Sequence, residues 1–95
     1  MNGDEGTLRR SATIRNQRGL HARAAAKFAK LAGNFQAEIQ VSRNGTSVSG
    51  VSIMGLMMLA AAIGVEIDLE ARGPQAQGAL DALVALIDAR FDEEE

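Results

Sequence analysis

The fold is organised around residues 16–26, which read NQRGLHARAAA. The glycine suits a loop, and the alanine run that follows favours a helix. His21, the chain's one histidine, therefore lies where a loop is expected to become a helix. Helix N-termini carry unpaired N–H groups and partial positive charge, so they bind anions. Because imidazole can act as a nucleophile near neutral pH, the stretch predicts a reactive histidine beside a phosphate-sized anion site.

Arg23 follows two residues after this histidine and adds a planar guanidinium that suits phosphate oxygens. The alternative is that His21 is an ordinary surface or capping residue, because single histidines near helix starts often are. Spacing alone leaves both interpretations open.

The bulk composition indicates one globular domain with a modest core. The chain has 95 residues, 46% of them hydrophobic and 23% charged, and a net charge of −2. This charge gives no reason to expect nucleic acid or an anionic membrane as partner. The absence of cysteine excludes disulfides, and with a single histidine it makes a transition-metal site unexpected. No signal-like or membrane-spanning apolar run is present, so we expect a cytoplasmic protein.

Hydrophobic periodicity predicts four strands and two long helices. Residues 35–42 and 65–71 alternate apolar and polar side chains, which is typical of strands with one face open to water. Asn44 and Gly45 indicate a tight hairpin. The expected strands are 7–15, 35–42, 46–49 and 65–71, and the expected helices are 22–32, a short piece in 52–59, and a last one from Pro74 that buries Leu80, Leu83, Val84, Ile87 and Phe91.

Two long helices can cover one face of a sheet. The predicted fold is therefore an α+β open-faced two-layer sandwich, with a four-stranded antiparallel sheet and the order βαββαβα. Residues 8–91 should form the single domain. Residues 1–7 are expected to be an N-terminal tail, and the acidic residues 92–95 a frayed C-terminal tail.

A second distinctive segment, residues 52–59, reads SIMGLMML and holds three of the four methionines. Leu56 and Leu59 fit the inner side of a short helix. So short an element cannot bury all the other large apolar side chains, namely Ile53, Met54, Met57 and Met58. We expect some of them to form an exposed contact surface, to which flexible methionine is suited. The alternative is that the whole segment belongs to the core.

Ser52 stands where a helix N-cap belongs, and its hydroxyl can accept a hydrogen bond from a backbone N–H.

Residues 19–23, GLHAR, resemble the active-site signature of the HPr family, the histidine-containing phosphocarriers of the phosphoenolpyruvate:sugar phosphotransferase system. The resemblance runs without gaps from about Leu8 to Phe91, although Ala24 stands where the family usually has proline. It implies the open-faced sandwich described above. It also implies that His21 accepts a phosphoryl group from Enzyme I, through Nδ1 in this family, and passes it to an Enzyme IIA-type acceptor. Such a protein is a carrier rather than an independent turnover enzyme, and it needs no cofactor.

The resemblance also implies roles for other residues. Arg23 would stabilise the phosphoryl group, while Lys30 is expected to be solvated. Partner docking would involve Arg23, Lys27, Ile53, Met54 and Met57. A neutral imidazole is the attacking form, and the positive end of a helix disfavours the imidazolium. A monomer suits a shuttle that must show one face to successive partners.

Residues 52–55, SIMG, resemble the regulatory-serine segment on which HPr kinase/phosphorylase acts in this family. A phosphate on Ser52 would gain from the helix dipole, yet it would place negative charge beside the docking surface. The expected result is weaker docking of Enzyme I.

Two other functions stay open from the sequence. The first is a regulatory, nitrogen-related phosphorelay carrier that moves no sugar. The second is a non-carrier α+β module that binds a ligand or partner through its methionines and leaves His21 idle.

Overall fold

The computed structural model describes residues 6–94 of the chain. Its element order is strand, helix, strand, strand, helix, strand, helix, followed by a short 3-10 turn. The elements are β1 (Thr7–Thr13), α1 (Ala22–Ala32), β2 (Glu38–Arg43), β3 (Thr46–Ser49), α2 (Ile53–Met58), β4 (Glu66–Arg72), α3 (Ala76–Asp88) and η1 (Arg90–Asp92).

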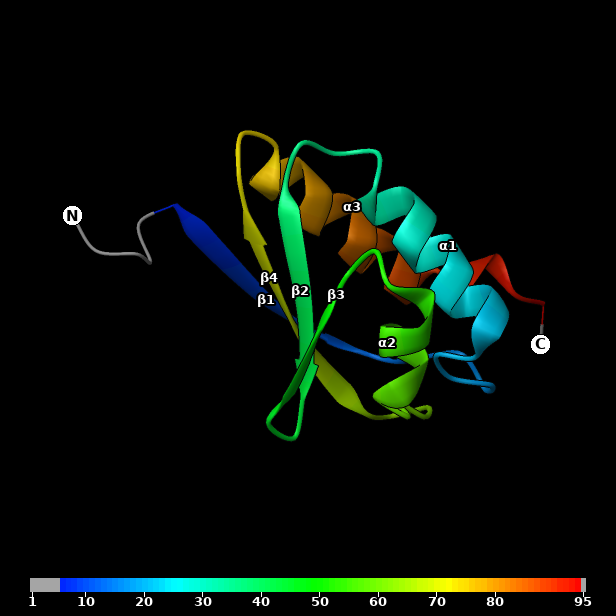
Figure 1. The fold of residues 1–95 in the computed structure, drawn as a ribbon. Helices are drawn as coiled ribbons and strands as arrows, with labels where there is room; N and C mark the ends of the chain where they lie inside the picture. Colours follow the sequence, from blue (N-terminus) through cyan, green and yellow to red (C-terminus); the bar gives the residue numbers. More distant parts are fainter. Residues whose placement is uncertain (1–5, 95) are drawn as a thin grey trace.

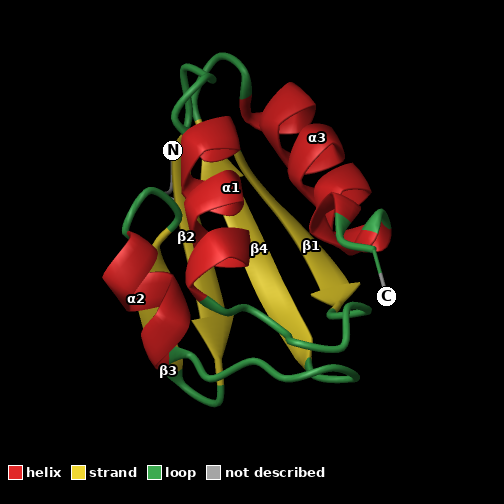
Figure 2. Cartoon of the chain, turned by 90° about the vertical axis from the view of Figure 1, so that its right-hand side faces the viewer, coloured by secondary structure: helices red, strands yellow, loops and turns green. Residues whose placement is uncertain are grey.

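The four strands form one antiparallel sheet in the order β1-β4-β2-β3. Figure 1 shows the sheet on one side of the molecule and all three helices on the other. In the view of Figure 2, the helices lie in front of the strands and leave the opposite face of the sheet uncovered. The predicted α+β open-faced sandwich and its element order are therefore confirmed.

The core lies between the sheet and the helices because alternate strand residues point toward the helices. Ile67 and Leu69 of β4 are fully buried there. Phe28 of α1 and Leu83 of α3 are also fully buried. Arg10 shares the covered side of β1 but reaches the edge, where its guanidinium pairs with Asp81 of α3 at 3.3 Å.

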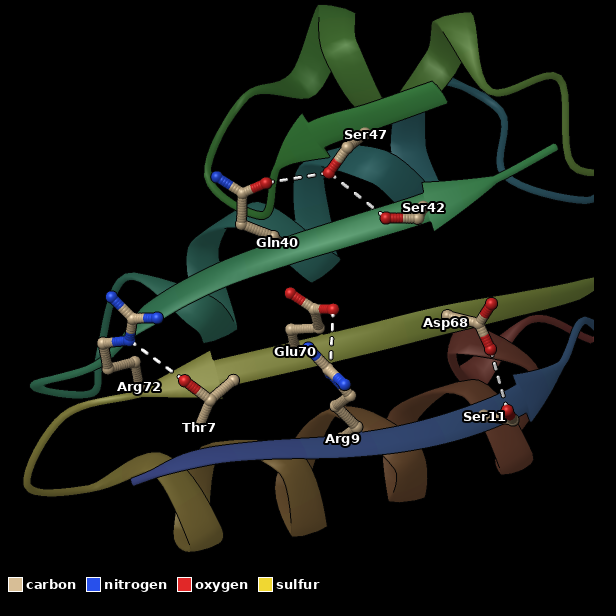
Figure 3. A network of polar contacts seen from close by, with 9 residues as sticks. All are labelled: Thr7, Arg9, Ser11, Gln40, Ser42, Ser47, Asp68, Glu70 and Arg72. Carbon is tan, nitrogen blue, oxygen red and sulfur yellow. Dashed lines mark hydrogen bonds and ion pairs between the residues drawn. The ribbon is translucent and has the colours of Figure 1, made fainter. Parts of the chain in front are cut away.

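The uncovered face of the sheet is polar, as the alternation predicted. Figure 3 shows short cross-strand contacts spread over it. Arg9 pairs with Glu70 at 3.0 Å. The Ser11 hydroxyl donates to Asp68 at 2.8 Å, and Ser47 donates to Gln40 at 2.8 Å. These side chains bind one another and keep this face compatible with water.

The predicted hairpin is confirmed between β2 and β3. Asn44 and Gly45 have positive φ angles of 51° and 82°, as a two-residue turn of this type requires. Arg43, at the end of β2, donates to the carbonyls of Leu59 and Ala60 at 2.8 and 3.0 Å. The hairpin is thereby tied to the end of α2.

The first strand ends at Thr13 rather than residue 15, and the second strand and the last helix both begin later than predicted. The second strand begins at Glu38 rather than residue 35. The backbone of Gln36 forms its hydrogen bonds with Gln75 and not with a neighbouring strand. Its carbonyl accepts from the Gln75 N–H at 3.0 Å, and its N–H donates to the Gln75 side chain at 2.6 Å. The same contacts delay the last helix, which begins at Ala76 and not at Pro74. Val84, expected to be buried, is half-buried.

The chain ends also differ from the prediction. Thr7, which is common to the predicted strand 7–15 and the predicted tail 1–7, belongs to β1 and lies opposite Arg72 of β4. Residues 1–5 and Glu95 lie outside the described residues. The expectation of a frayed C-terminal tail is wrong for Asp92 and Glu93. Asp92 ends η1, and the Glu93 side chain is only 13% exposed.

No helix among residues 6–94 is long and apolar enough to cross a membrane. The same part of the chain holds no cluster of three or more histidine, cysteine or acidic side chains that could bind a metal ion.

Candidate functional site

His21 occupies the N-cap position of α1, as the sequence predicted. Its backbone is extended (φ −74°, ψ −179°), and its carbonyl accepts the first helical hydrogen bond, from the Ala25 N–H at 2.8 Å. The imidazole makes no capping hydrogen bond, and its side chain is 16% exposed. His21 is therefore neither a capping side chain nor a freely solvated one. The N–H groups of residues 22–24 precede the first helical bond, and helix geometry gives them no intrahelical acceptor.

The loop before His21 is braced against the segment that follows α2. Gly19 adopts φ +67°, a conformation that residues with a side chain rarely take. The next N–H, that of Leu20, donates to the Ala61 carbonyl at 2.9 Å, and the Leu20 side chain is buried. Asn16, at the start of the loop, is fully buried, and its Nδ2 donates to the Gly19 carbonyl at 2.7 Å. These contacts fix the point from which His21 enters the helix.

Glu93 brings a carboxylate to the imidazole from the other end of the chain. Its Oε2 contacts Nε2 of His21, and its Oε1 accepts from Nδ2 of Asn16 at 3.0 Å. Asn16 thus uses one amide proton for the loop and the other for Glu93, whereas its Oδ1 has no hydrogen-bond partner among the described residues. Figure 1 shows the C-terminal segment, in red, returning beside the start of α1.

The ionisation of Glu93 is favoured by its neighbours. Burial alone raises the pKa of this carboxyl group, but hydrogen bonds from His21 and Asn16 outweigh burial, and the charges of His21 and Arg18 act in the same direction. The net effect holds the pKa of Glu93 below its ordinary value of 4.5. The ionised carboxylate is therefore the form that this part of the fold prefers.

We expect acidification to weaken the contribution of Glu93 to folding. Because its pKa is lower in the folded protein, Glu93 stabilises the fold above the unfolded-state pKa, and this contribution is lost as the pH falls through the folded-state value. Urea unfolding at about pH 7 and about pH 3.5 should show a smaller acid-induced loss of stability in Glu93→Gln than in the wild type. Glu38→Gln, at an exposed position on β2, should behave as the wild type. If all three proteins lost the same amount of stability on acidification, the ionised Glu93 would not stabilise the fold.

A left-handed turn carries Glu93 to the site. Arg90, Phe91 and Asp92 all have positive φ angles, between 54° and 59°. Such angles cost energy in residues other than glycine, so surrounding contacts must hold the turn. The Phe91 ring is fully buried, and the Phe91 carbonyl accepts from Nζ of Lys27 at 2.7 Å. Phe91 was expected on the buried stripe of the last helix; it is buried, but beyond the end of α3.

A cleft of about 370 Å³ opens beside the imidazole. Its walls are strongly charged, with basic groups from the loop and α1 facing acidic groups from the C-terminal segment. Arg23 is exposed and lines this cleft together with His21, as the sequence predicted. Lys27 lines it too, although its ammonium already binds the Phe91 carbonyl. The full lining is Gln17, Arg18, His21, Arg23, Lys27, Asp92, Glu93 and Glu94.

The segment after β3 forms an exposed apolar surface next to α1. Helix α2 packs against α1 through its inner side, where Leu56 is fully buried, and Leu59 directly after it is 4% exposed. The outward side chains are 43–75% exposed, so the alternative that the whole segment is core is wrong. We define the apolar patch as Val51, Ile53, Met54, Met57, Met58 and Ile63.

Ser52 is the N-cap of α2. Its hydroxyl accepts from the Gly55 N–H at 3.0 Å, as predicted, and the residue is half-buried. In the sequence, Ser52 is flanked by two members of the apolar patch, Val51 and Ile53.

The cleft residues that the sequence did not single out include Arg18 and Glu93. Arg18 directly precedes the signature residues 19–23, but nothing in the sequence pattern distinguished it from an ordinary surface arginine. Glu93 is 72 residues from His21 in the sequence, and a run of acidic residues at a chain end gave no sign of a specific contact.

Comparison with known proteins decides the family. The sequence matches, over residues 8–89, a family model described as "PTS HPr component phosphorylation site". The chain belongs to the HPr family. A phosphocarrier protein HPr from Cupriavidus necator is 57% identical over 88 residues, which are 93% of this chain and 99% of that protein. A phosphocarrier protein NPr from Shewanella violacea is 49% identical over 86 residues, which are 90% and 94% of the two chains.

Solved structures agree with this assignment. The crystal structure of HPr-C-His from Thermoanaerobacter tengcongensis has a TM-score of 0.88 and 39% sequence identity, and the match covers 93% of this chain and 99% of that one. The protein is thus an HPr/NPr-type phosphocarrier of the phosphotransferase system. This membership favours the carrier hypotheses over that of an unrelated binding module.

Proposed function

We propose that His21 is the phosphoryl acceptor, charged by the phosphohistidine of Enzyme I and discharged to a histidine of an Enzyme IIA-type protein. The observation that carries the proposal is the position of His21, with its ring at the start of α1 beside a charged cleft. Nε2 is engaged by Glu93, and Nδ1 forms no hydrogen bond with a described residue. Nδ1 is therefore the ring nitrogen with a lone pair available for phosphorus.

The surroundings of His21 suit phosphoryl transfer. Such a reaction depends mainly on positioning and on stabilising the charge of the phosphoryl oxygens. The backbone N–H groups at the start of α1 and the guanidinium of Arg23 supply donors for these oxygens. The acidic groups in the same cleft limit how tightly a phosphoryl group is held, which suits a carrier that must release it.

The apolar patch and the basic residues of α1 form the proposed docking surface for both partners. Met54 is 75% exposed, while Ile53 and Met57 are each 43% exposed. Apolar areas of this kind on a small domain mark contact surfaces, and methionine adapts to partners of different shape. Arg23 and Lys27 border the cleft on the side of α1. A cytoplasmic monomer is the form that fits this shuttle.

Phosphorylation of Ser52, for example by an HPr kinase/phosphorylase, is proposed to weaken docking of Enzyme I. Ser52 is flanked in the sequence by Val51 and Ile53, two members of the apolar patch that a partner would cover, and its hydroxyl caps α2. A charge there would have to be desolvated when the partner docks.

Ser52→Asp should therefore lower the rate of phosphorylation by Enzyme I at limiting carrier concentration by about tenfold, equivalent to about 1.4 kcal/mol of docking energy. Aspartate is also a good N-cap, so α2 should remain folded. Thr46→Asp, with the same charge change in the β2–β3 hairpin, should react as the wild type. Rates that match for Ser52→Asp and Thr46→Asp would argue against the regulatory role.

The choice between sugar uptake and nitrogen-related regulation depends on the acceptor. The similarity to proteins named HPr and to proteins named NPr is compatible with either branch. The protein is first charged with phosphoenolpyruvate and Enzyme I and then mixed with an Enzyme IIA of each branch. Fast discharge to a sugar-specific acceptor supports the uptake carrier, and fast discharge to the nitrogen-related acceptor supports the regulatory one. If phosphoenolpyruvate and Enzyme I left His21 without a phosphoryl group, the proposed function would be wrong.

A further inference from the structure

The two nitrogens of the His21 ring have different environments. Nε2 faces a carboxylate, and Nδ1 has no partner among residues 6–94. A carboxylate only accepts hydrogen bonds, so the neutral ring must carry its proton on Nε2 to bind Glu93. The hydrogen bond at one ring nitrogen sets the protonation of the other. This contact therefore selects the tautomer with a free lone pair on Nδ1.

The position of Glu93 is built by several independent contacts. Asn16 is fully buried and donates to Oε1, so one carboxylate oxygen is fixed by the loop and the other by the ring. The buried Phe91 and the bond from Lys27 to its carbonyl hold the preceding turn. Three successive residues adopt left-handed angles to make that turn. Left-handed angles are costly in residues other than glycine, so these contacts are what hold the carboxylate at the imidazole.

We propose that Glu93 is a positioning residue for phosphoryl transfer, which holds the His21 ring with Nε2–H bound and Nδ1 directed to react. This inference rests on the function proposed above. Asp92 and Glu94 line the same cleft, but no contact joins either to the imidazole within the described part of the chain. Among the described residues of the C-terminal segment, Glu93 is thus the acidic residue that acts on the ring.

The reaction step shows a second consequence of this contact. The Nδ1 lone pair attacks phosphorus, the new N–P bond forms, and the N–P bond to the donor histidine breaks, so that the electron pair returns to the donor nitrogen. The proton on Nε2 stays in place. The His21 ring therefore becomes positively charged as it takes the phosphoryl group, and the Glu93 carboxylate offsets that charge. Offsetting the positive charge of the ring should therefore speed the phosphorylation of His21 more than it strengthens the docking of Enzyme I.

The first test is the Nε2 proton itself. Proton NMR of ¹⁵N-labelled protein is recorded at alkaline pH, where imidazole is neutral. The wild type should show a downfield Nε2–H resonance, because a bond to a carboxylate protects this proton from exchange with water. Glu93→Ala should lose the resonance, and Glu38→Ala, which removes a distant exposed carboxylate of β2, should keep it. An unchanged resonance in Glu93→Ala would overturn the proposal.

The second test is the kinetics of charging by Enzyme I and phosphoenolpyruvate. Glu93→Ala should lower kcat by about tenfold while the KM for the carrier changes by less than about twofold. Glu93→Gln, which keeps an acceptor oxygen but removes the charge, should fall between Glu93→Ala and the wild type. If the wild type is charged and Glu93→Ala matches it, the positioning role is wrong and the carrier function stands. If the wild type takes no phosphate, both fail.

Discussion

Phe91→Ala should destabilise the protein by about 4 kcal/mol, the largest loss we expect from a single substitution. The ring is fully buried in the core, so its removal leaves a cavity there. It also anchors the left-handed turn that places Glu93 against His21. The substitution should therefore lower the free energy of unfolding in urea and, in the protein that remains folded, abolish the Nε2–H resonance of His21.

Phe35→Ala is the matched control for this experiment. Phe35 is half-buried at the far end of the helical layer, where it packs beside Gly78 of α3. Its loss should cost about 1 kcal/mol and leave the His21 resonance in place. A Phe91→Ala protein as stable as Phe35→Ala would show that the C-terminal turn is not packed as described.

Gly19→Ala should cost about 3 kcal/mol and also slow charging of His21. At φ +67° a side chain is strained, and a Cβ on Gly19 would lie 2.5 Å from the Ala61 carbonyl oxygen and 3.0 Å from the Ala62 Cα. Both are backbone atoms, which cannot turn aside as a flexible side chain would. The loop must shift, and His21 enters α1 only two residues later. Misplacement of the nucleophile should reduce the charging rate by about tenfold.

Gly64→Ala is the control that distinguishes the steric clash expected at Gly19 from the strain of a positive φ angle alone. Gly64 has a comparable φ of +86°, but a Cβ there would meet no atom within 4 Å. This variant should lose about 1 kcal/mol and keep the wild-type charging rate. Equal losses in the two variants, measured by urea unfolding, would mean that the contact between the loop and Ala61 does not constrain the site.

The sheet and the start of α1 could be predicted because their signals are local. Alternation in β4 and the Asn44-Gly45 turn follow from neighbouring residues, and α1 is bounded by residues that the sequence marks clearly. The position of His21 at the helix start followed from the same local pattern. The exposure of Met54 followed from the size of α2, which is too small to bury all its apolar side chains.

The C-terminal half of the site could not be predicted because it depends on contacts between distant residues. Glu93 reaches His21 only through a turn in which Arg90, Phe91 and Asp92 are left-handed, and neither arginine nor phenylalanine favours that conformation. The late start of β2 has the same origin, since Gln36 is held by Gln75 across the fold. Secondary-structure propensity depends on residues close together in the chain, and at these positions contacts between distant residues override it.

The most direct measurement is the site of phosphorylation in the charged protein. The wild type and His21→Ala are incubated with phosphoenolpyruvate and Enzyme I, and each is examined by intact-mass spectrometry before and after acid treatment. ³¹P–¹H NMR then identifies the nitrogen that carries phosphorus. We predict one acid-labile phosphoryl group on the wild type, bound to Nδ1 of His21, and none on His21→Ala. Equal labelling of the two proteins, or phosphorus on Nε2, would contradict the account.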